Sequence, residues 1–88
     1  AVYLTPNDIQ LGKRESVADI ARNLDRLVDL IMARTFAHET LIELAQHSSV
    51  PVINGLSDLL HPCQVLSDVL TITERRGRME GLRVVFIG

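Results

Sequence analysis

Apolar residues spaced by three and four positions predict the helices of this chain. After Ser16, such residues return on every turn, which is typical of one apolar stripe along a helix. Ser16 and Asp19 have the spacing of an N-terminal helix cap, and the apolar period changes near Asp29. We therefore predict a helix that begins at Ser16 and ends around Arg26 to Val28, and a shorter second helix from about His38 to His47.

A third helix is predicted to begin at His61-Pro62. Proline is favoured at the first helical position because the N–H it lacks has no helical partner there. Arg75, Arg76 and Arg78 suit the C-terminal end of this helix, and Gly77 is a typical stop. The side chains expected to form its buried face are Val65, Leu66, Val69, Leu70 and Thr73.

Four short apolar runs that alternate with these helices predict strands. The runs are Ala1–Leu4, Leu30–Ala33, Val50–Ile53 and Leu82–Ile87. A turn signal, Thr5-Pro6-Asn7-Asp8, follows the first run, and Asn54-Gly55 is expected to close the third. Continuously apolar strands that alternate with helices predict an α/β fold, a parallel sheet with helices on both faces. Ligands of such sheets bind at the carboxyl ends of the strands.

Composition narrows the range of partners. Eighty-eight residues form one small domain, and nine Lys and Arg against eleven Asp and Glu give a net charge of -2, which argues against a general nucleic-acid binder. No apolar run approaches the ~20 residues of a membrane span. Cys63 is the only cysteine, which fits a reducing compartment. We therefore predict a cytoplasmic protein with no nucleic-acid and no membrane partner.

The start of the third predicted helix carries the strongest candidate chemistry. His61 at the expected N-cap and Gln64 one turn later project beside free backbone N–H groups, which serve an anionic or oxygen-rich ligand well. In a simpler interpretation, which spacing alone favours, His61 only caps the helix and Gln64 is solvated. His38 and His47 have no partner at ligand spacing, so no metal site is expected.

The same stretch resembles a known family. His61-Pro62-Cys63-Gln64 resembles the His-Pro-x-Gln signature of the aspartate/ornithine carbamoyltransferase family. Residues 50–58 resemble its ornithine branch, since the aspartate branch usually has an Asn-Ala-Gly-Asp-like run there. Ile20 departs from that branch, which usually has threonine. The likeness covers essentially the whole chain, and the other similar stretches are Gln10-Leu11-Gly12, Glu15-Ser16 and Asp19-x-Ala21-Arg22.

The resemblance implies roles for four residues in binding carbamoyl phosphate. Arg34 and His61 are the expected catalytic residues, which donate hydrogen bonds to the carbamoyl oxygen, while Gln64 accepts one from the carbamoyl NH₂ group. Gln10 is expected to reach into a neighbouring subunit and meet the phosphate there. Cys63 is not expected to be a nucleophile, because the family transfers the carbamoyl group directly.

The resemblance also implies the activity of the parent protein. That activity is transfer of the carbamoyl group of carbamoyl phosphate to the side-chain amine of L-ornithine, giving citrulline and phosphate, without cofactor or metal, in a trimer-based homo-oligomer. Residues 1–80 are expected to be part of the carbamoyl-phosphate-binding domain with its interdomain helix, and residues 81–88 the first strand of the ornithine-binding domain. The family's Ser-x-Arg-Thr phosphate loop is not in the sequence, so we expect an internal fragment that is inactive alone.

Two alternatives remain open at this point. The chain can be the corresponding fragment of an aspartate-branch enzyme, against which residues 50–58 argue. It can also belong to a non-catalytic α/β paralogue that has kept the sheet and lost the chemistry. A Ser-x-Arg-Thr loop in the upstream sequence would separate this paralogue from an enzyme.

Overall fold

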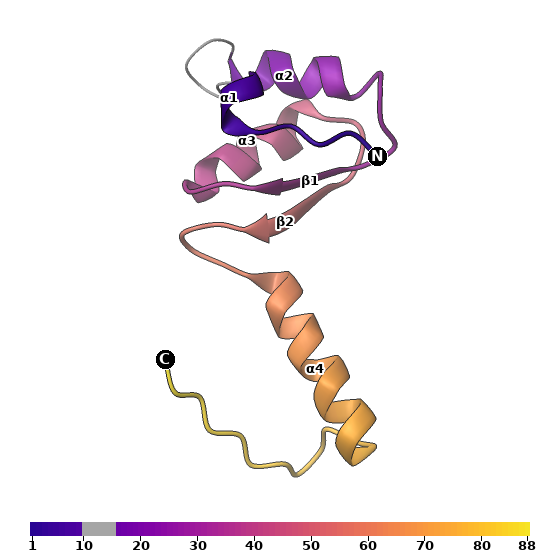
Figure 1. Cartoon of the computed structure of the whole chain (residues 1–88), viewed down its shortest axis with the longest axis vertical. Helices are drawn as coiled ribbons and strands as arrows, with labels where there is room; N and C mark the ends of the chain where they lie inside the picture. The colour runs from indigo at the N-terminus through magenta and orange to yellow at the C-terminus, as the bar shows by residue number, and fades with distance from the viewer. Residues whose placement is uncertain (10–15) are drawn as a thin grey trace.

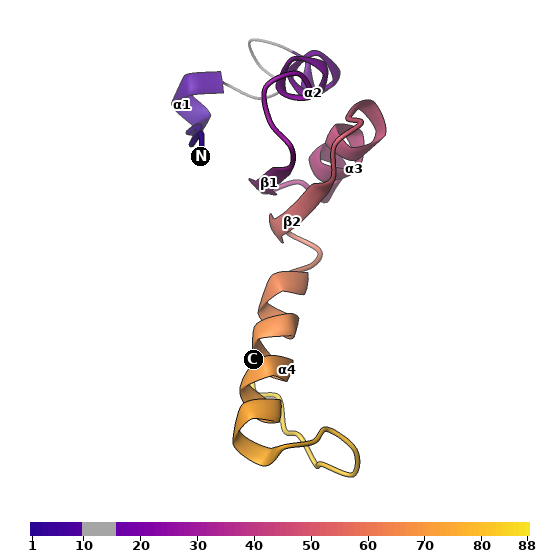
Figure 2. The ribbon, with the colours of Figure 1, turned by 90° about the vertical axis from the view of Figure 1, so that its right-hand side faces the viewer.

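The computed structural model describes residues 1–9 and 16–88 of the chain (Figure 1). The molecule is elongated, with extents of 48 × 27 × 21 Å. One end holds a strand–helix–strand unit with a second helix beside it, and a long helix runs away from this unit (Figure 2). In chain order, the elements are α1 Pro6–Ile9, α2 Val17–Leu24, β1 Ile31–Arg34, α3 His38–His47, β2 Val52–Leu56 and α4 Pro62–Arg76.

The two strands pair in parallel, which confirms the predicted α/β class with a parallel sheet. Ile31 lies opposite Val52, and a bulge between Ala33 and Arg34 shifts the register so that Arg34 lies opposite Leu56. The predicted helix from His38 to His47 is α3, which connects the strands. Parallel strands need such a crossover, because the first strand ends at the edge opposite to the one where the second begins.

The core lies where α2, α3 and the sheet meet. Val17 and Ala21 of α2 pack with Leu44 of α3, and Ala33 and Val52 of the strands pack against them. The apolar stripe predicted for the first helix therefore faces the core at its N-terminal end.

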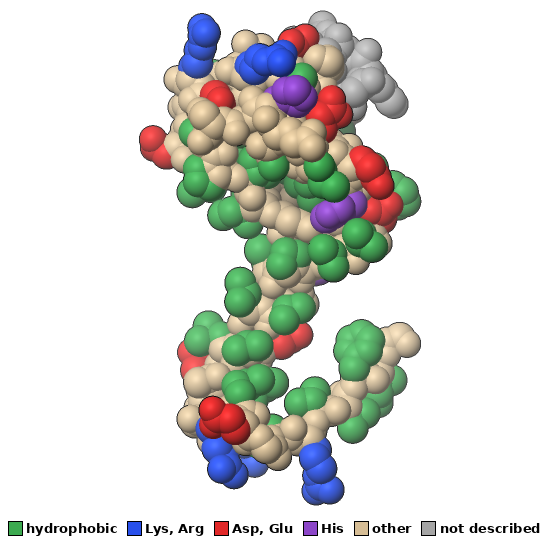
Figure 3. Space-filling view, turned by 180° about the vertical axis from the view of Figure 1, so that it is seen from behind, with side chains coloured by type: hydrophobic (Ala, Val, Ile, Leu, Met, Phe, Trp, Pro, Cys, Tyr) green, Lys and Arg blue, Asp and Glu red, His purple; other side chains and the backbone are tan. Residues whose placement is uncertain are grey.

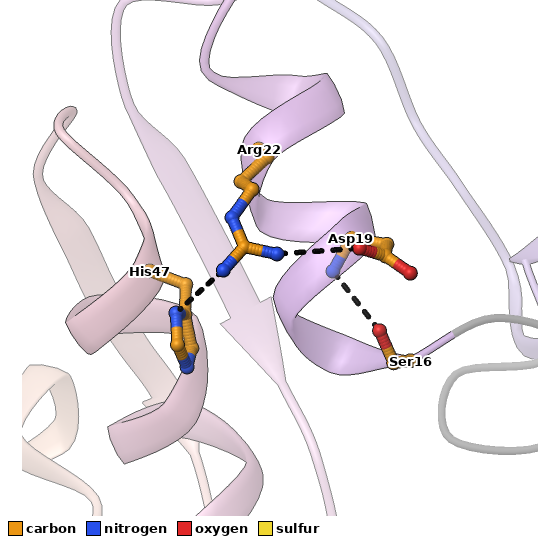
Figure 4. A network of polar contacts seen from close by, with 4 residues as sticks. All are labelled: Ser16, Asp19, Arg22 and His47. Carbon is orange, nitrogen blue, oxygen red and sulfur yellow. Dashed lines mark hydrogen bonds and ion pairs between the residues drawn. The ribbon is translucent and has the colours of Figure 1, made fainter.

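Polar contacts join α2 to α3 beside this core (Figure 4). The backbone N–H of Asp19 donates to Oγ of Ser16 at 3.2 Å, which confirms the predicted cap. Nη1 of Arg22 lies 3.3 Å from Oδ1 of Asp19, and its Nη2 lies 3.4 Å from Nδ1 of His47. The ion pair is solvent-exposed, so its contribution to stability is small, about 0–1 kcal/mol.

Asp25 ends α2 and anchors the segment that leads into β2. Its carboxylate accepts hydrogen bonds from Oγ of Ser48 at 2.6 Å, from the backbone N–H and Oγ of Ser49 at 2.7 and 2.9 Å, and from the N–H of Val50 at 3.3 Å. These bonds, that of the Ser48 hydroxyl first, lower the pKa of Asp25 from 3.8 to about 2. The helix α2 ends at Leu24 rather than at the predicted 26–28, although turn hydrogen bonds continue as far as the Val28 N–H, which donates to the Leu24 carbonyl oxygen at 3.1 Å.

The first and last predicted strands are not strands in this structure. Residues 1–4 and 82–87 lie outside its two-stranded sheet, and apolar side chains there are exposed, from 40% at Leu4 to 92% at Ile87. An apolar run becomes a strand only where a neighbouring backbone completes its hydrogen-bond ladder, and within the described residues neither run has such a neighbour. The predicted turn at residues 5–8 is confirmed and belongs to the single helical turn α1.

The middle strands are close to their predicted positions, but Asn54-Gly55 does not close β2. β1 is shifted by one residue from Leu30–Ala33, and β2 extends through Gly55 to Leu56. A Cβ atom at Gly55 would lie 2.6 Å from Sδ of Met32 and 3.2 Å from the carbonyl oxygen of Ala33. Glycine here therefore allows a close approach to β1 beside the bulge, and does not form a turn.

The long helix α4 begins and ends as predicted, but its expected buried face is exposed. His61 is its N-cap, Pro62 its first residue, and Gly77 ends it in the left-handed region with φ 76°. No residue of α4 is buried, and Figure 3 shows hydrophobic side chains along its surface and along the C-terminal segment. Nothing in the described chain packs over this face. The apolar periodicity identified the face correctly as apolar, but it did not show whether another element covers it. Among the described residues, no helix combines the length and the apolar character that crossing a membrane requires.

Loss of the Asp25 carboxylate is expected to lower stability in a pH-dependent way. Because the folded state lowers the pKa of Asp25 to about 2, the stabilisation is complete above about pH 4 and is lost as the pH falls through about 2. The melting temperature of the full-length protein should therefore exceed that of the Asp25→Ala variant near neutral pH, and the difference should shrink below pH 4. The control is Asp29→Ala, which removes a nearby exposed carboxylate. The role of Asp25 would be contradicted if Asp25→Ala lowered the melting temperature no more than Asp29→Ala does, or by the same amount at every pH.

A side chain at Gly55 is expected to destabilise the sheet. Gly55→Val places branched atoms where Met32 and the Ala33 carbonyl already lie, and such overpacking costs about 1–3 kcal/mol. Urea unfolding of the full-length protein measures this loss. Ile53→Val, at a partly exposed position of the same strand, is the matched control and should change the free energy of unfolding much less. Equal stability of Gly55→Val and the parent would refute the close approach.

Candidate functional site

The carboxyl ends of β1 and β2 lie side by side, and hydrogen bonds tie the segments that follow them. The N–H of Thr35 donates to the carbonyl oxygen of Leu56 at 3.0 Å, which extends the ladder by one step. The N–H of Asp58 donates to the carbonyl oxygen of Phe36 at 2.7 Å, and Oδ1 of Asp58 accepts from the N–H of His38 at 3.0 Å. This edge is where the sequence predicted a ligand site.

Ser57 organises the loop 57–61 that leads into α4. Its side chain is buried, with 6% of the residue exposed. The Ser57 N–H donates to the carbonyl oxygen of Leu60 at 3.0 Å, and the Leu60 N–H donates to Oγ of Ser57 at 3.2 Å. Nδ1 of His38 lies 2.8 Å from the same Oγ. The loop is therefore closed on itself and joined to the first residue of α3.

Two further contacts join Asn54 of β2 to the loop 57–61 and to the first turn of α4. Nδ2 of Asn54 donates to the carbonyl oxygen of Leu60 at 3.4 Å, and the thiol of Cys63 donates to the backbone carbonyl of Asn54 at 3.3 Å. The Cys63 side chain therefore connects the helix to the strand. Its contacts give no support to a nucleophilic role.

His61 does not act as a side-chain cap, although it is the N-cap residue of α4. Its side chain makes no capping hydrogen bond, which contradicts the side-chain cap of the simpler interpretation, whereas Gln64 is exposed as that interpretation expects. Nδ1 is buried and has no hydrogen-bond partner among the described residues, and the same is true of Oδ1 of Asn54. Buried polar atoms without partners are uncommon in folded proteins, and each requires an explanation.

Gln64 is exposed on the first turn of α4, and its amide group is oriented by Asp68. Nε2 of Gln64 donates to Oδ1 of Asp68 at 2.9 Å, while the backbone N–H of Gln64 bonds the carbonyl oxygen of His61 at 3.1 Å. A carboxylate only accepts hydrogen bonds, so it selects the NH₂ end of the amide. The Oε1 atom of Gln64 is then the part of the amide that can accept from another donor.

Arg34 is the last residue of β1 and is exposed at the same edge. Strand pairing places it beside Leu56, five residues before His61. The described contacts bring Gln64 and His61 together through the backbone, but none joins Arg34 to either side chain. Gln10, the fourth predicted binding residue, lies outside the described residues.

An open hollow of about 390 Å³ borders His61 on the side of α4. It is lined by Leu60, His61, Pro62, Val65 and Leu66, so it is mostly apolar. A larger hollow of about 570 Å³ lies at the far end of α4, beside residues 81–85. Neither of these two hollows is lined by Arg34 or Gln64. Within the described ranges, no three His, Cys, Asp or Glu residues gather as metal ligands.

Sequence reasoning did not assign His38, Ser57 and Asp58 a part in this edge. The available signal was a Ser-Asp pair four residues after a predicted strand, in a loop where such side chains often bond nearby backbone. The partner on the other strand's loop, His38, had no such signal, because its contact depends on the parallel pairing.

Residues 1–74 match the family model described as the carbamoyl-phosphate-binding domain of aspartate/ornithine carbamoyltransferases. The chain belongs to this family. The match extends from the N-terminus into α4 and includes the signature at residues 61–64, which confirms the predicted family resemblance.

Relatives of similar sequence carry the ornithine name. The chain is 57% identical over 88 residues to the ornithine carbamoyltransferase of Cenarchaeum symbiosum and 56% identical over 88 residues to the chloroplastic one of Pisum sativum. These matches cover 100% of this chain, but 29% and 24% of the relatives. The chain thus spans about a quarter of the length of these relatives.

A solved structure gives the same result for the fold. The ornithine carbamoyltransferase of Pyrococcus furiosus superposes with a TM-score of 0.89 and 51% sequence identity, over 92% of this chain and 26% of that chain. The arrangement of helices about the parallel strand pair is therefore the one found in this family. These relatives support the ornithine branch, and give no support to the aspartate-branch alternative.

Proposed function

We propose that the full-length protein transfers the carbamoyl group of carbamoyl phosphate to the side-chain amine of L-ornithine, giving citrulline and phosphate. The observation that carries this proposal is the identity of 57% over the whole chain to a relative named ornithine carbamoyltransferase. The placement of the His61–Gln64 signature at the start of α4, beside the carboxyl ends of the strands, supports it.

In this reaction the ornithine nitrogen forms a bond to the carbamoyl carbon, and the bond from that carbon to the phosphate oxygen breaks. The amine loses a proton, and phosphate leaves with the electron pair of the broken bond. Negative charge grows on the carbamoyl oxygen during the attack. Hydrogen-bond donors that are already in place stabilise this charge more than they stabilise the substrate, and so lower the barrier.

Arg34 and His61 are the proposed donors to that oxygen. Arg34 is exposed at the end of β1, so its guanidinium is available to a ligand at the sheet edge. His61 makes no capping bond, and its Nδ1 lacks a partner in the described chain, so its imidazole retains hydrogen-bonding capacity. Closure of the site around carbamoyl phosphate would bring the two groups to one oxygen.

Gln64 is the proposed acceptor for the carbamoyl NH₂ group. Because the Asp68 carboxylate holds the NH₂ end of the Gln64 amide, Oε1 is the atom left for the substrate. A carbonyl oxygen is the group that an amide NH₂ needs as a partner. This orientation distinguishes the nitrogen of the carbamoyl group from its oxygen.

The remaining parts of the proposal concern the whole protein. We assign residues 1–80 to the carbamoyl-phosphate-binding domain with α4 as an interdomain helix, and residues 81–88 to the first strand of the ornithine-binding domain. The exposed apolar face of α4 and the exposed side chains of residues 84–87 support this division, since both require cover in a stable protein. A trimer, in which Gln10 reaches a neighbouring subunit, and a cytoplasmic location belong to the same proposal.

Removal of the His61 imidazole is expected to lower the rate strongly. His61→Ala in the full-length protein should reduce kcat by about 10²–10³, the usual effect of losing one such donor. Citrulline formation from carbamoyl phosphate and ornithine measures this, and circular dichroism checks the fold. His47→Ala, at the exposed end of α3, is the control and should keep the parent's rate. A folded protein that forms no citrulline before any substitution would overturn the proposed function.

Removal of the Arg34 guanidinium should have a similar effect through the same oxygen. Arg34→Ala is expected to lower kcat by about 10²–10³, with Arg75→Ala near the end of α4 as the matched control. Arg34→Lys keeps the charge but loses the planar pair of donors, so it should recover only part of the rate. If Arg34→Ala and Arg75→Ala had equal rates, Arg34 would have no place in the site.

A further inference from the structure

Ser57 is the one buried polar residue among those that the structure describes. Its Oγ atom has three neighbours at hydrogen-bond distance: Nδ1 of His38 at 2.8 Å, the N–H of Leu60 at 3.2 Å and the carbonyl oxygen of Leu60 at 3.3 Å. The shortest of these contacts comes from α3, nineteen residues away along the chain. The loop 57–61 is therefore held from outside as well as by its own bonds.

The hydrogen bonds of this cluster can form with either neutral tautomer of the His38 imidazole. A hydroxyl has one proton to donate and two lone pairs that accept. If Nδ1 of His38 carries a proton, it donates to Oγ, and the Ser57 hydroxyl donates to the Leu60 carbonyl. If Nδ1 is bare, the hydroxyl donates to Nδ1 instead. In both cases the Leu60 N–H keeps its acceptor, so the loop stays closed.

The backbone of His38 holds the same loop by a second bond. Ala37, the N-cap of α3, has no side chain that can cap the helix, and Oδ1 of Asp58 accepts the His38 N–H in its place. The negative carboxylate lies at the positive end of the helix, which stabilises it further. Asp58 is thus bound to α3 by its side chain and to Phe36 by its N–H.

These hydrogen bonds also fix the position of His61. Both backbone groups of Leu60, the residue directly before His61, bond to Ser57, and the Leu60 carbonyl also accepts from Asn54. The direction in which the chain enters α4 is therefore set by the cluster around Ser57. We infer that His38 is a positioning residue, which fixes the loop 57–61 through Ser57 and thereby the imidazole of His61; its effect on rate rests on the function proposed above.

The test uses four variants of the full-length protein: His38→Ala, His38→Asn, Ser57→Ala and the double variant His38→Ala/Ser57→Ala. Asparagine places a polar atom near the position of Nδ1, so it can restore the bond to Ser57 that alanine removes. His47→Ala is the matched control, because His47 lies on the same helix and contacts Arg22 rather than the loop.

Hydrogen exchange of residues 57–61 is the first readout, and it does not depend on catalysis. We expect faster exchange in His38→Ala and Ser57→Ala, recovery in His38→Asn, and no change in His47→Ala. The second readout is steady-state kinetics. A misplaced His61 should lower kcat/KM for carbamoyl phosphate by about 10- to 100-fold with a raised KM for that substrate, while a loss of folded protein alone would lower kcat and leave KM unchanged.

The double variant decides whether His38 acts through Ser57. If it does, the double variant should be no worse than Ser57→Ala alone, whereas independent effects would multiply. Unchanged exchange at residues 57–61 in His38→Ala, failure of asparagine to restore it, or multiplied effects would each overturn the inference. A parent protein that forms no citrulline would overturn the proposed function only, since the exchange measurement still decides whether His38 holds the loop.

Discussion

Parallel pairing of β1 with β2 is the constraint on which the rest of the described structure depends. Because both strands run in one direction, both end at the same edge, and the segments after them must lie together. That proximity puts His38 beside Ser57 and Asp58, residues about twenty positions apart in sequence. In an antiparallel pair, these segments would lie at opposite ends of the sheet, and no such cluster could form.

Some polar groups at this edge of the sheet have hydrogen-bond partners within the described chain, and others have none. Ser57 and Asp58 have all their principal hydrogen bonds within the chain, so they form a fixed frame. Nδ1 of His61 and Oδ1 of Asn54 are buried beside that frame and have no partner in the described chain. Each of these two buried atoms has given up hydrogen bonds to water without gaining one from the described chain, which costs free energy.

Local signals in the sequence were sufficient to predict that α2, α3, α4 and the two middle strands exist, although not all of their ends. Ser16 with Asp19, and Pro62 with Gly77, act within a few residues of their own positions, so their effect can be predicted without a fold. Asn54-Gly55 failed as a turn signal because Gly55 is required by the neighbouring strand rather than by its own backbone. The signature His61–Gln64 indicated the candidate site, whereas the role of His38 depends on contacts across the sheet that no local pattern contains.

Because α4 is exposed along its length, the hydrogen bonds at its first turn determine where it begins. Within the described chain α4 buries no residue, and its described contacts with the sheet are made to β2. Packing along its length therefore cannot set where the helix begins. That position is set by the Cys63 thiol on the Asn54 carbonyl and by the loop 57–61, which Ser57 closes. A few hydrogen bonds, each worth about 1 kcal/mol, thus determine where His61 and Gln64 stand relative to the end of β1.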